Sequence, residues 1–220
     1  MQMIPRRLFF EKRGRIKYIS HLDTMRAFTR SLGRSGLPLW YTEGFNPHLY
    51  LTFTLPLALG CEGLRETVDI RLTLPVSEGD LVLNVNDKLP PGLRVIQAAE
   101  PVHKPADVAW SDYRLELMLQ GQEGKLAEQM RAFCSEKEIM VVKKTKKGEQ
   151  NLNIAPFSGL LEMEESADSV TVVVRLASGT QQNVSISLWL DAFWDFTGGT
   201  DFLARAQRVN MLCGDLTAFC

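Results

Sequence analysis

Residues 6–34, RRLFFEKRGRIKYISHLDTMRAFTRSLGR, carry the clearest structural pattern of the chain. Residues 6–10 predict a strand that enters a basic turn at 12–15 and leaves it along 16–19. Ser20 has the features of a helix N-cap, because an acidic residue follows three positions later, as in a capping box. The stretch therefore predicts a strand, a basic turn and a helix. The side chains expected to face the core are Leu22, Met25, Phe28 and Leu32, and those expected to form an exposed stripe are Asp23, Arg26, Arg30 and Arg34.

The rest of the first hundred residues extends this pattern into a complete module. Residues 37–41, 49–55 and 66–74 predict strands, with apolar and polar side chains alternating most clearly in the last two. Residues 77–88 predict a helix, and residues 93–96 predict a closing strand. The order of elements is that of a split βαβ, or ferredoxin-like, unit.

The second half of the chain predicts a similar module after a linker. Residues 101–110 contain two prolines and little apolar periodicity, which is typical of a linker. Strand patterns then alternate with helix patterns at 124–137 and 187–197. The sequence therefore predicts an α+β protein with two ferredoxin-like modules in tandem, at 1–100 and 111–220, each an antiparallel sheet covered by helices.

The charges of the chain are unevenly distributed. The first 34 residues hold nine Lys and Arg against two Asp and Glu, whereas the other 186 hold sixteen against twenty-four, for a formal net charge of −1. Such asymmetry favours a polyanionic partner, which we expect to be RNA. The residues predicted to contact RNA are Lys12, Arg13, Arg15, Lys17, Ser20, His21, Arg26, Arg30, Phe45, Asn46, His48, Lys143 and Lys144.

Each of these segments also has a purely structural interpretation. The helix face that carries Arg26 and Arg30 could be ordinary solvated surface. The loop at 44–48 lies among aromatic residues that could either stack on unpaired bases or belong to the core. The lysine-rich tip at 143–147 could hold phosphates or simply end a soluble hairpin.

His21 and His48 are the candidate catalytic residues. Two imidazoles can serve as general base and acid in a metal-free RNA cleavage, but nothing in the sequence shows that these two meet in space. The chain contains no P-loop, GxGxxG, HExxH or GxSxG motif. Its four cysteines are scattered, without the spacing of a zinc or iron–sulfur site. We therefore expect no metal and no cofactor, and catalysis is an alternative to binding.

Hydrophobicity along the chain predicts a cytoplasmic protein. No apolar run approaches the ~20 residues that a membrane span needs. The first residues lack the uninterrupted apolar core and the cleavage site of a signal peptide. We expect free thiols and no membrane partner.

Several motifs resemble those of a known family. The segments that carry the resemblance are Ile19–Phe28, Arg30, Gly36–Leu39, Tyr41–His48 and Leu55–Gly60. With their SHLD, GFNPH and PLxLG motifs, they are similar to the radical-SAM-linked proteins (DUF2344) over about the first hundred residues. Members of that family are encoded beside or fused to a radical SAM protein, often near an RNase E/G-type gene and ribosomal protein genes. The resemblance implies an RNA-handling role, and because this chain has no cluster-binding cysteine triad, it implies a partner of the radical enzyme.

The leading hypothesis from the sequence is an RNA-binding accessory protein that presents rRNA or tRNA to a radical SAM partner. One alternative is a metal-independent endoribonuclease that uses His21. Another is a protein–protein adaptor that binds no RNA and docks through aromatic residues of the second half. Those residues, which could equally form the core, are Trp189, Phe193, Trp194 and Phe196.

Overall fold

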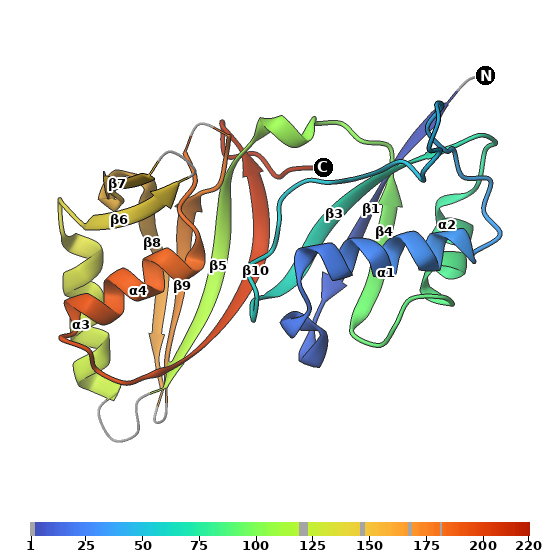
Figure 1. The fold of residues 1–220 in the computed structure, drawn as a ribbon. Helices are drawn as coiled ribbons and strands as arrows, with labels where there is room; N and C mark the ends of the chain where they lie inside the picture. Colours follow the sequence, from blue (N-terminus) through green and yellow to red (C-terminus); the bar gives the residue numbers. More distant parts are fainter. Residues whose placement is uncertain (1–2, 119–122, 146–147, 167–168, 181) are drawn as a thin grey trace. The chain divides into compact units, whose positions relative to one another are not determined.

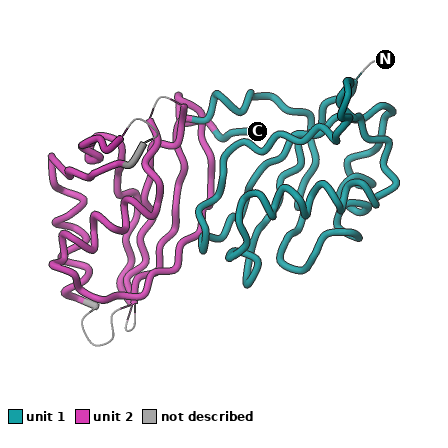
Figure 2. The backbone as a smooth tube through the Cα atoms, viewed as in Figure 1, with its two compact units in different colours: residues 1–108, 218–220 teal, residues 109–217 magenta. Residues whose placement is uncertain are grey.

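The computed structural model describes the chain as an α+β protein (Figure 1). It forms two compact units (Figure 2): unit 1 is Met1–Val108 together with Ala218–Cys220, and unit 2 is Ala109–Thr217. The division after Val108 falls within the segment expected to be a linker. Four α-helices are found in the described part, and none of them is long and apolar enough to cross a membrane. The described residues are 3–118, 123–145, 148–166, 169–180 and 182–220.

Unit 1 consists of four strands, two helices and two short 3₁₀ helices. The strands are β1 (Ile4–Lys12), β2 (Leu51–Phe53), β3 (Glu62–Leu72) and β4 (Leu93–Ala99). The helices are α1 (His21–Gly33) and α2 (Glu78–Asn86), and the 3₁₀ helices are η1 (Gly14–Tyr18) and η2 (Pro105–Asp107). β1 lies between β4 and β3, and β2 pairs with the other edge of β3. The order is therefore β4-β1-β3-β2, and all three pairings are antiparallel.

Both helices of unit 1 pack on the same face of these strands (Figure 1). Phe28 and Leu32 of α1 share one core cluster with Leu81 and Val85 of α2. Alternate residues of a strand point to the same face, so the even-numbered positions of β1 and β3 face the helices. The strand residues in this cluster are Leu8, Phe10, Val68, Ile70, Leu72, Leu93, Val95 and Ala98.

The helix α1 begins where the sequence predicts, but its buried face differs from the prediction. Ser20 is the N-cap. Thr24 and Ser31 occupy buried positions, because their hydroxyls donate to backbone carbonyls and are not left unsatisfied. Leu22 is 53% exposed, so the prediction that it faces the core is wrong.

The segment after the basic turn also differs from the prediction. Residues 16–19 do not form a strand, because the chain curls into η1 instead. Gly14 has a φ of +69°, and the N–H of Arg13 donates to the carbonyl of Gly92 at 2.8 Å. These two features close the turn beside the start of β4. The short strand expected at 37–41 is represented by isolated bridges at Leu39 and Tyr41.

Arg7 lies on the opposite face of β1 from the helices and is fully buried. Its Nε and Nη2 donate to the two carboxylate oxygens of Asp69 on β3, at 2.7 and 2.8 Å. Nη1 also donates to the carbonyl of Cys220 at 2.8 Å, and Nη2 to that of His103 at 2.9 Å. The guanidinium lies 4.2 Å from the ring centroid of Phe219. Arg7 thereby ties the C-terminal residues to unit 1.

Unit 2 has the same kinds of element and an additional hairpin. The strands β5 (Val108–Met118), β8 (Ser158–Glu165), β9 (Val170–Ala177) and β10 (Leu203–Cys213) lie in the order β10-β5-β9-β8. β6 (Met140–Thr145) and β7 (Gly148–Asn153) form a separate antiparallel pair. The helices are α3 (Glu123–Ser135) and α4 (Ile186–Phe196), and η3 (Ala155–Phe157) precedes β8.

Aromatic residues of the two helices form part of the core of unit 2. The ring of Phe133 on α3 lies 5.2 Å from that of Trp189 and 5.4 Å from that of Phe193, measured between centroids. Trp189 and Phe193 are buried, as the structural interpretation of this helix expected. Trp194 and Phe196, on the same helix, remain partly exposed.

Candidate functional site

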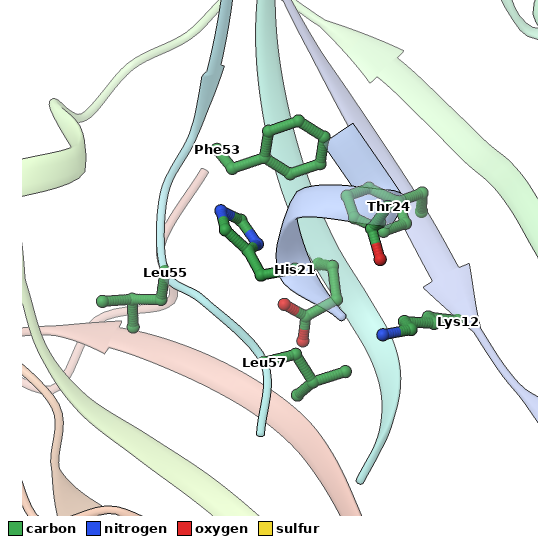
Figure 3. Close-up of a pocket in the computed structure, with 8 residues that line it drawn as sticks. Lys12, His21, Thr24, Phe53, Leu55 and Leu57 are labelled. Carbon is green, nitrogen blue, oxygen red and sulfur yellow. The ribbon is translucent and has the colours of Figure 1, made fainter. Parts of the chain in front are cut away.

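A small cavity lies at the N-terminal end of α1, between this helix, β1, β3 and the segment that follows β2 (Figure 3). Its volume is about 10 Å³, which is room for about one water molecule. Its walls are apolar and polar in about equal measure, and three titratable side chains reach it. The lining residues are Phe10, Lys12, His21, Thr24, Phe53, Leu55, Leu57 and Glu66.

His21 enters this cavity because it is the first residue of the buried face of α1. Positions 21, 24 and 28 follow each other at helical spacing, and Thr24 and Phe28 are buried. The imidazole meets the ring of Phe53 edge to face, with 5.4 Å between centroids and 86° between planes. Figure 3 shows the ring of His21 beside Phe53, while Lys12 reaches the cavity from β1. His21 is therefore held in a defined orientation at the cavity wall.

Lys12 is an internal residue, with 2% of its surface exposed. Its ammonium donates to the carbonyl of Ile19 at 2.8 Å. Burial lowers the pKa of Lys12, whereas the negative charge of Glu66 opposes this shift by favouring the ammonium form. Glu66 is itself buried, and a side chain on Gly63, which is the β3 partner of Lys12, would overlap with it. A buried cation and a buried carboxylate thus share the cavity with His21.

The other predicted cations of the first segment lie on the surface. Arg13, Arg15, Arg26 and Arg30 are exposed, and Lys17 is half-buried. Arg26 forms an exposed ion pair with Asp23 at 3.0 Å, one turn back along α1. These side chains extend from η1 and α1, on either side of Ser20.

Ser20 acts within the helix cap. Its hydroxyl accepts the N–H of Asp23 at 3.1 Å and donates to a carboxylate oxygen of the same residue at 2.7 Å. The hydrogen bond from Ser20, followed by that from Arg26, lowers the pKa of the Asp23 carboxyl. These bonds close the first turn of α1.

The loop at 44–48 is closed at its base and open at its tip. The N–H of Thr42 donates to the carbonyl of His48 at 2.8 Å, and the Thr42 hydroxyl lies 2.9 Å from Nδ1 of the same histidine. Nδ1 of His48 also lies 3.2 Å from the carbonyl of Asn46. Phe45, at the tip, is 107% exposed. His48 is not among the residues that line the cavity of His21, so the two histidines have different surroundings.

Trp40 and Tyr50, which flank this loop, contact a cation, whereas the neighbouring Tyr41 is 47% exposed. The guanidinium of Arg71 lies 4.0 Å from the ring centroid of Tyr50 and 5.3 Å from that of Trp40. Both rings are only partly exposed. They therefore belong to the packing at the base of the loop.

The lysine-rich tip lies in unit 2. The ammonium of Lys143 donates to the carbonyl of Asn183 at 2.7 Å. The backbone of Lys144 pairs with Glu149 in the β6–β7 hairpin. Lys146 and Lys147 lie outside the described residues.

Glu66 was not among the site residues predicted from the sequence. The sequence does contain an indication of this role, because position 66 lies on the same inward-facing side of β3 as Val68, Ile70 and Leu72. A carboxylate at such a position requires a polar partner, and Lys12 has the same inward phase on β1. Among the described residues, no group of three or more His, Cys, Asp or Glu could hold a metal ion.

Comparison with known proteins gives a family but no activity. No curated protein matches the chain significantly. One similar solved structure is the crystal structure of an unknown protein from Galdieria sulphuraria, which is 11% identical and has a TM-score of 0.28, with 94% of this chain and 99% of that chain covered. A likeness at this level carries no argument about function. The model of the family described as "Uncharacterized protein conserved in bacteria (DUF2344)" matches residues 6–186. The chain therefore belongs to the DUF2344 family.

Proposed function

We propose that this protein is an RNA-binding accessory protein that presents an RNA substrate, rRNA or tRNA, to a radical SAM partner enzyme. The observation that carries the proposal is the group of exposed or half-buried cations that lie just before η1, on η1 and on α1. Guanidinium groups bind phosphate oxygens through two parallel hydrogen bonds, which suits them to an RNA backbone. The side chains that would hold phosphates are Arg13, Arg15, Lys17, Arg26 and Arg30.

The radical SAM partner rests on a separate argument. Its support is the resemblance of the SHLD, GFNPH and PLxLG segments to radical-SAM-linked proteins. The described residues hold no cluster of cysteines for an iron–sulfur centre, and the four cysteines are widely spaced in the sequence. This chain would therefore bind the RNA, and the partner enzyme would catalyse the reaction.

We also infer that each unit is a ferredoxin-like module. The support in unit 1 is the order β1, α1, β2, β3, α2, β4 combined with the strand order β4-β1-β3-β2. Unit 2 has the corresponding order β10-β5-β9-β8, with the β6–β7 hairpin inserted after α3. The same fold serves many functions, so this inference does not by itself support RNA binding.

Binding of the full chain to a fluorescein-labelled RNA, followed by anisotropy, tests the proposal. Five phosphate contacts to single-stranded RNA predict a slope of about −3.5 for log affinity against log salt concentration. Arg26→Ala with Arg30→Ala should make the slope shallower by about 1.4 and weaken binding. Lys125→Ala with Lys137→Ala removes the same charge from exposed positions of unit 2 and is the matched control. Equal losses in both double variants, or no loss in either, would contradict the proposal.

A second candidate function is a metal-independent endoribonuclease. The observation that favours it is that His21, Lys12 and Glu66 line one cavity. In such a reaction a base removes the proton of the ribose 2′-OH, and the 2′-oxygen attacks the adjacent phosphorus. The bond from phosphorus to the 5′-oxygen breaks, and an acid protonates the departing 5′-oxygen. The cavity is too small for a nucleotide, so the phosphate would bind at its mouth. The test is cleavage in EDTA that leaves a 2′,3′-cyclic phosphate and disappears in His21→Ala. RNA that stays intact with the natural protein would exclude this candidate.

A further inference from the structure

Tyr18 is an aromatic side chain that packing in unit 1 leaves open to solvent. It is the last residue of η1, and 66% of its surface is exposed. The backbone of Gly60 lies against the ring, because a Cβ on Gly60 would be 3.7 Å from Cε1 of Tyr18. The N–H of Gly60 also donates to the carbonyl of Lys17 at 3.0 Å. The ring is therefore supported from one side by a fixed backbone and presented to solvent on another.

The neighbours of Tyr18 combine apolar surface with positive charge. Leu59, which precedes Gly60, is 67% exposed. The ammonium of Lys17 lies over the Tyr18 ring, 5.3 Å from its centroid, so a base that stacks on this face must displace it. Arg15 is exposed on the same 3₁₀ helix. A nucleotide with an unpaired base has matching chemistry, since its base can stack on a ring and its phosphates can meet the cations.

Phe45 provides a contrast, because it is still more exposed than Tyr18. Residues 35–64 contain no lysine or arginine, and the exposed Glu43 lies two residues from Phe45. The cation beside this loop is Arg71, whose guanidinium is stacked on the rings of Tyr50 and Trp40. A nucleic-acid backbone would thus meet little positive charge beside Phe45. Of these two exposed rings, Tyr18 is the better match for RNA.

We infer that Tyr18, together with Leu59, is a stacking platform for one unpaired base, with Lys17 and Arg15 beside the adjoining phosphates. The inference rests on the proposed RNA binding and makes it more specific, because it names single-stranded RNA as the ligand. In a duplex the bases are stacked on one another and only their edges are accessible, so a ring cannot stack on them except at an end.

The test compares two fluorescein-labelled RNAs, an unstructured 12-mer and a hairpin whose stem is of similar length, each with the full chain. We expect tighter binding of the unstructured RNA. Tyr18→Ala should weaken that binding about 10-fold, because stacking on an aromatic side chain contributes substantially to the binding of each base. Tyr18→Phe should retain the affinity, and Phe45→Ala should weaken it much less than Tyr18→Ala does. Both replaced side chains are exposed, and circular dichroism will verify that each variant is folded.

Three outcomes would overturn the inference. The first is an unstructured RNA that binds equally well to the natural protein and to Tyr18→Ala, because RNA binding would then stand without the platform. The second is a loss in Phe45→Ala instead of Tyr18→Ala, which would move the base contact to the loop at 44–48. The third is the absence of binding to either RNA, which would remove the proposed function as well.

Discussion

The strand β1 and the segment that follows it both carry positively charged side chains. β1 buries Arg7 and Lys12, whereas the cations of η1 and α1 are exposed or, at Lys17, half-buried. The difference comes from the partners that the fold supplies. Arg7 meets the carboxylate of Asp69, and Lys12 shares a cavity with Glu66. Arg15 lies instead on an exposed 3₁₀ helix. A concentration of charge in a sequence thus combines two kinds of residue, those that stabilise the fold and those that are available to a ligand.

The largest effect on stability is expected when a buried cation is removed, in Arg7→Ala. The change removes both hydrogen bonds to Asp69 and those to the carbonyls of His103 and Cys220. The carbonyl of Cys220 keeps the N–H groups of Val102 and His103 as donors, whereas the carboxylate of Asp69 loses its buried cation. We expect the free energy of unfolding to fall by about 3–5 kcal/mol, as when one partner of a buried ion pair is removed. Urea denaturation measures this change.

Arg15→Ala is the matched control, because it removes the same side chain from an exposed position. Its free energy of unfolding should stay within about 0.5 kcal/mol of that of the natural protein. A loss below about 1 kcal/mol in Arg7→Ala would show that the buried cation contributes no more than a surface pair does.

The next largest effect is expected from Gly92→Ala, which tests how η1 holds its exposed cations. Gly92 has a φ of +91°, and a Cβ there would lie 2.6 Å from the carbonyl oxygen of Arg13 and 2.8 Å from Cγ2 of Ile16. Because both the backbone and a neighbouring side chain would have to move, we expect a loss of about 2–3 kcal/mol in the free energy of unfolding. Displacement of η1 should also weaken RNA binding. Gly33→Ala is the control, because nothing lies within 4 Å of the added carbon. Similar losses in the free energy of unfolding of both variants would contradict the expectation that close contacts at Gly92 cause the effect.

The sequence predicted the elements of unit 1 better than it predicted their buried faces. The start of α1 followed from Ser20, whose capping interaction is local in the chain. Residues 16–19 were wrongly expected to form a strand, because four residues are too few to distinguish an alternating pattern from a 3₁₀ turn. The structure forms the turn through Gly92, which lies far along the sequence.

The site was harder to predict for a similar reason. A burial pattern built from apolar residues alone excluded Thr24, although its hydroxyl is satisfied by the carbonyl of Ser20 within the helix. The positions of Lys12 and Glu66 depend on the pairing of β1 with β3, which the spacing of residues does not specify. His21 was recognised as a residue of interest, but its neighbours in the cavity follow only from the fold.

A smaller effect is expected when the cap of α1 is removed. Ser20→Ala deletes the acceptor of the Asp23 N–H, which should lower the free energy of unfolding by about 1 kcal/mol. The Ser20 hydroxyl is also the largest cause of the lowered pKa of Asp23, so this pKa should rise in the variant, as an NMR titration can measure. Since the folded-state pKa is lowered, the stability linked to Asp23 is present above its ordinary pKa and is lost as the pH falls through the lowered value. Ser20→Thr should keep both properties, and an unchanged Asp23 pKa in Ser20→Ala would contradict the assignment.

The last and smallest effect appears only in alkaline solution and concerns Lys12. Burial lowers its pKa in the folded protein below the ordinary value of 10.5, so between these two values the folded state binds fewer protons than the unfolded state. Lys12 therefore contributes a stability that increases as the pH rises through this window. In Lys12→Met the contribution is absent, so the difference in free energy of unfolding, natural protein minus variant, should increase between pH 7 and pH 10.5. Urea denaturation of both proteins at several pH values measures it. A difference that decreases with pH would mean that the charge of Glu66 outweighs burial, in which case Lys12 would be held as a firm ion-pair partner and not as a desolvated amine.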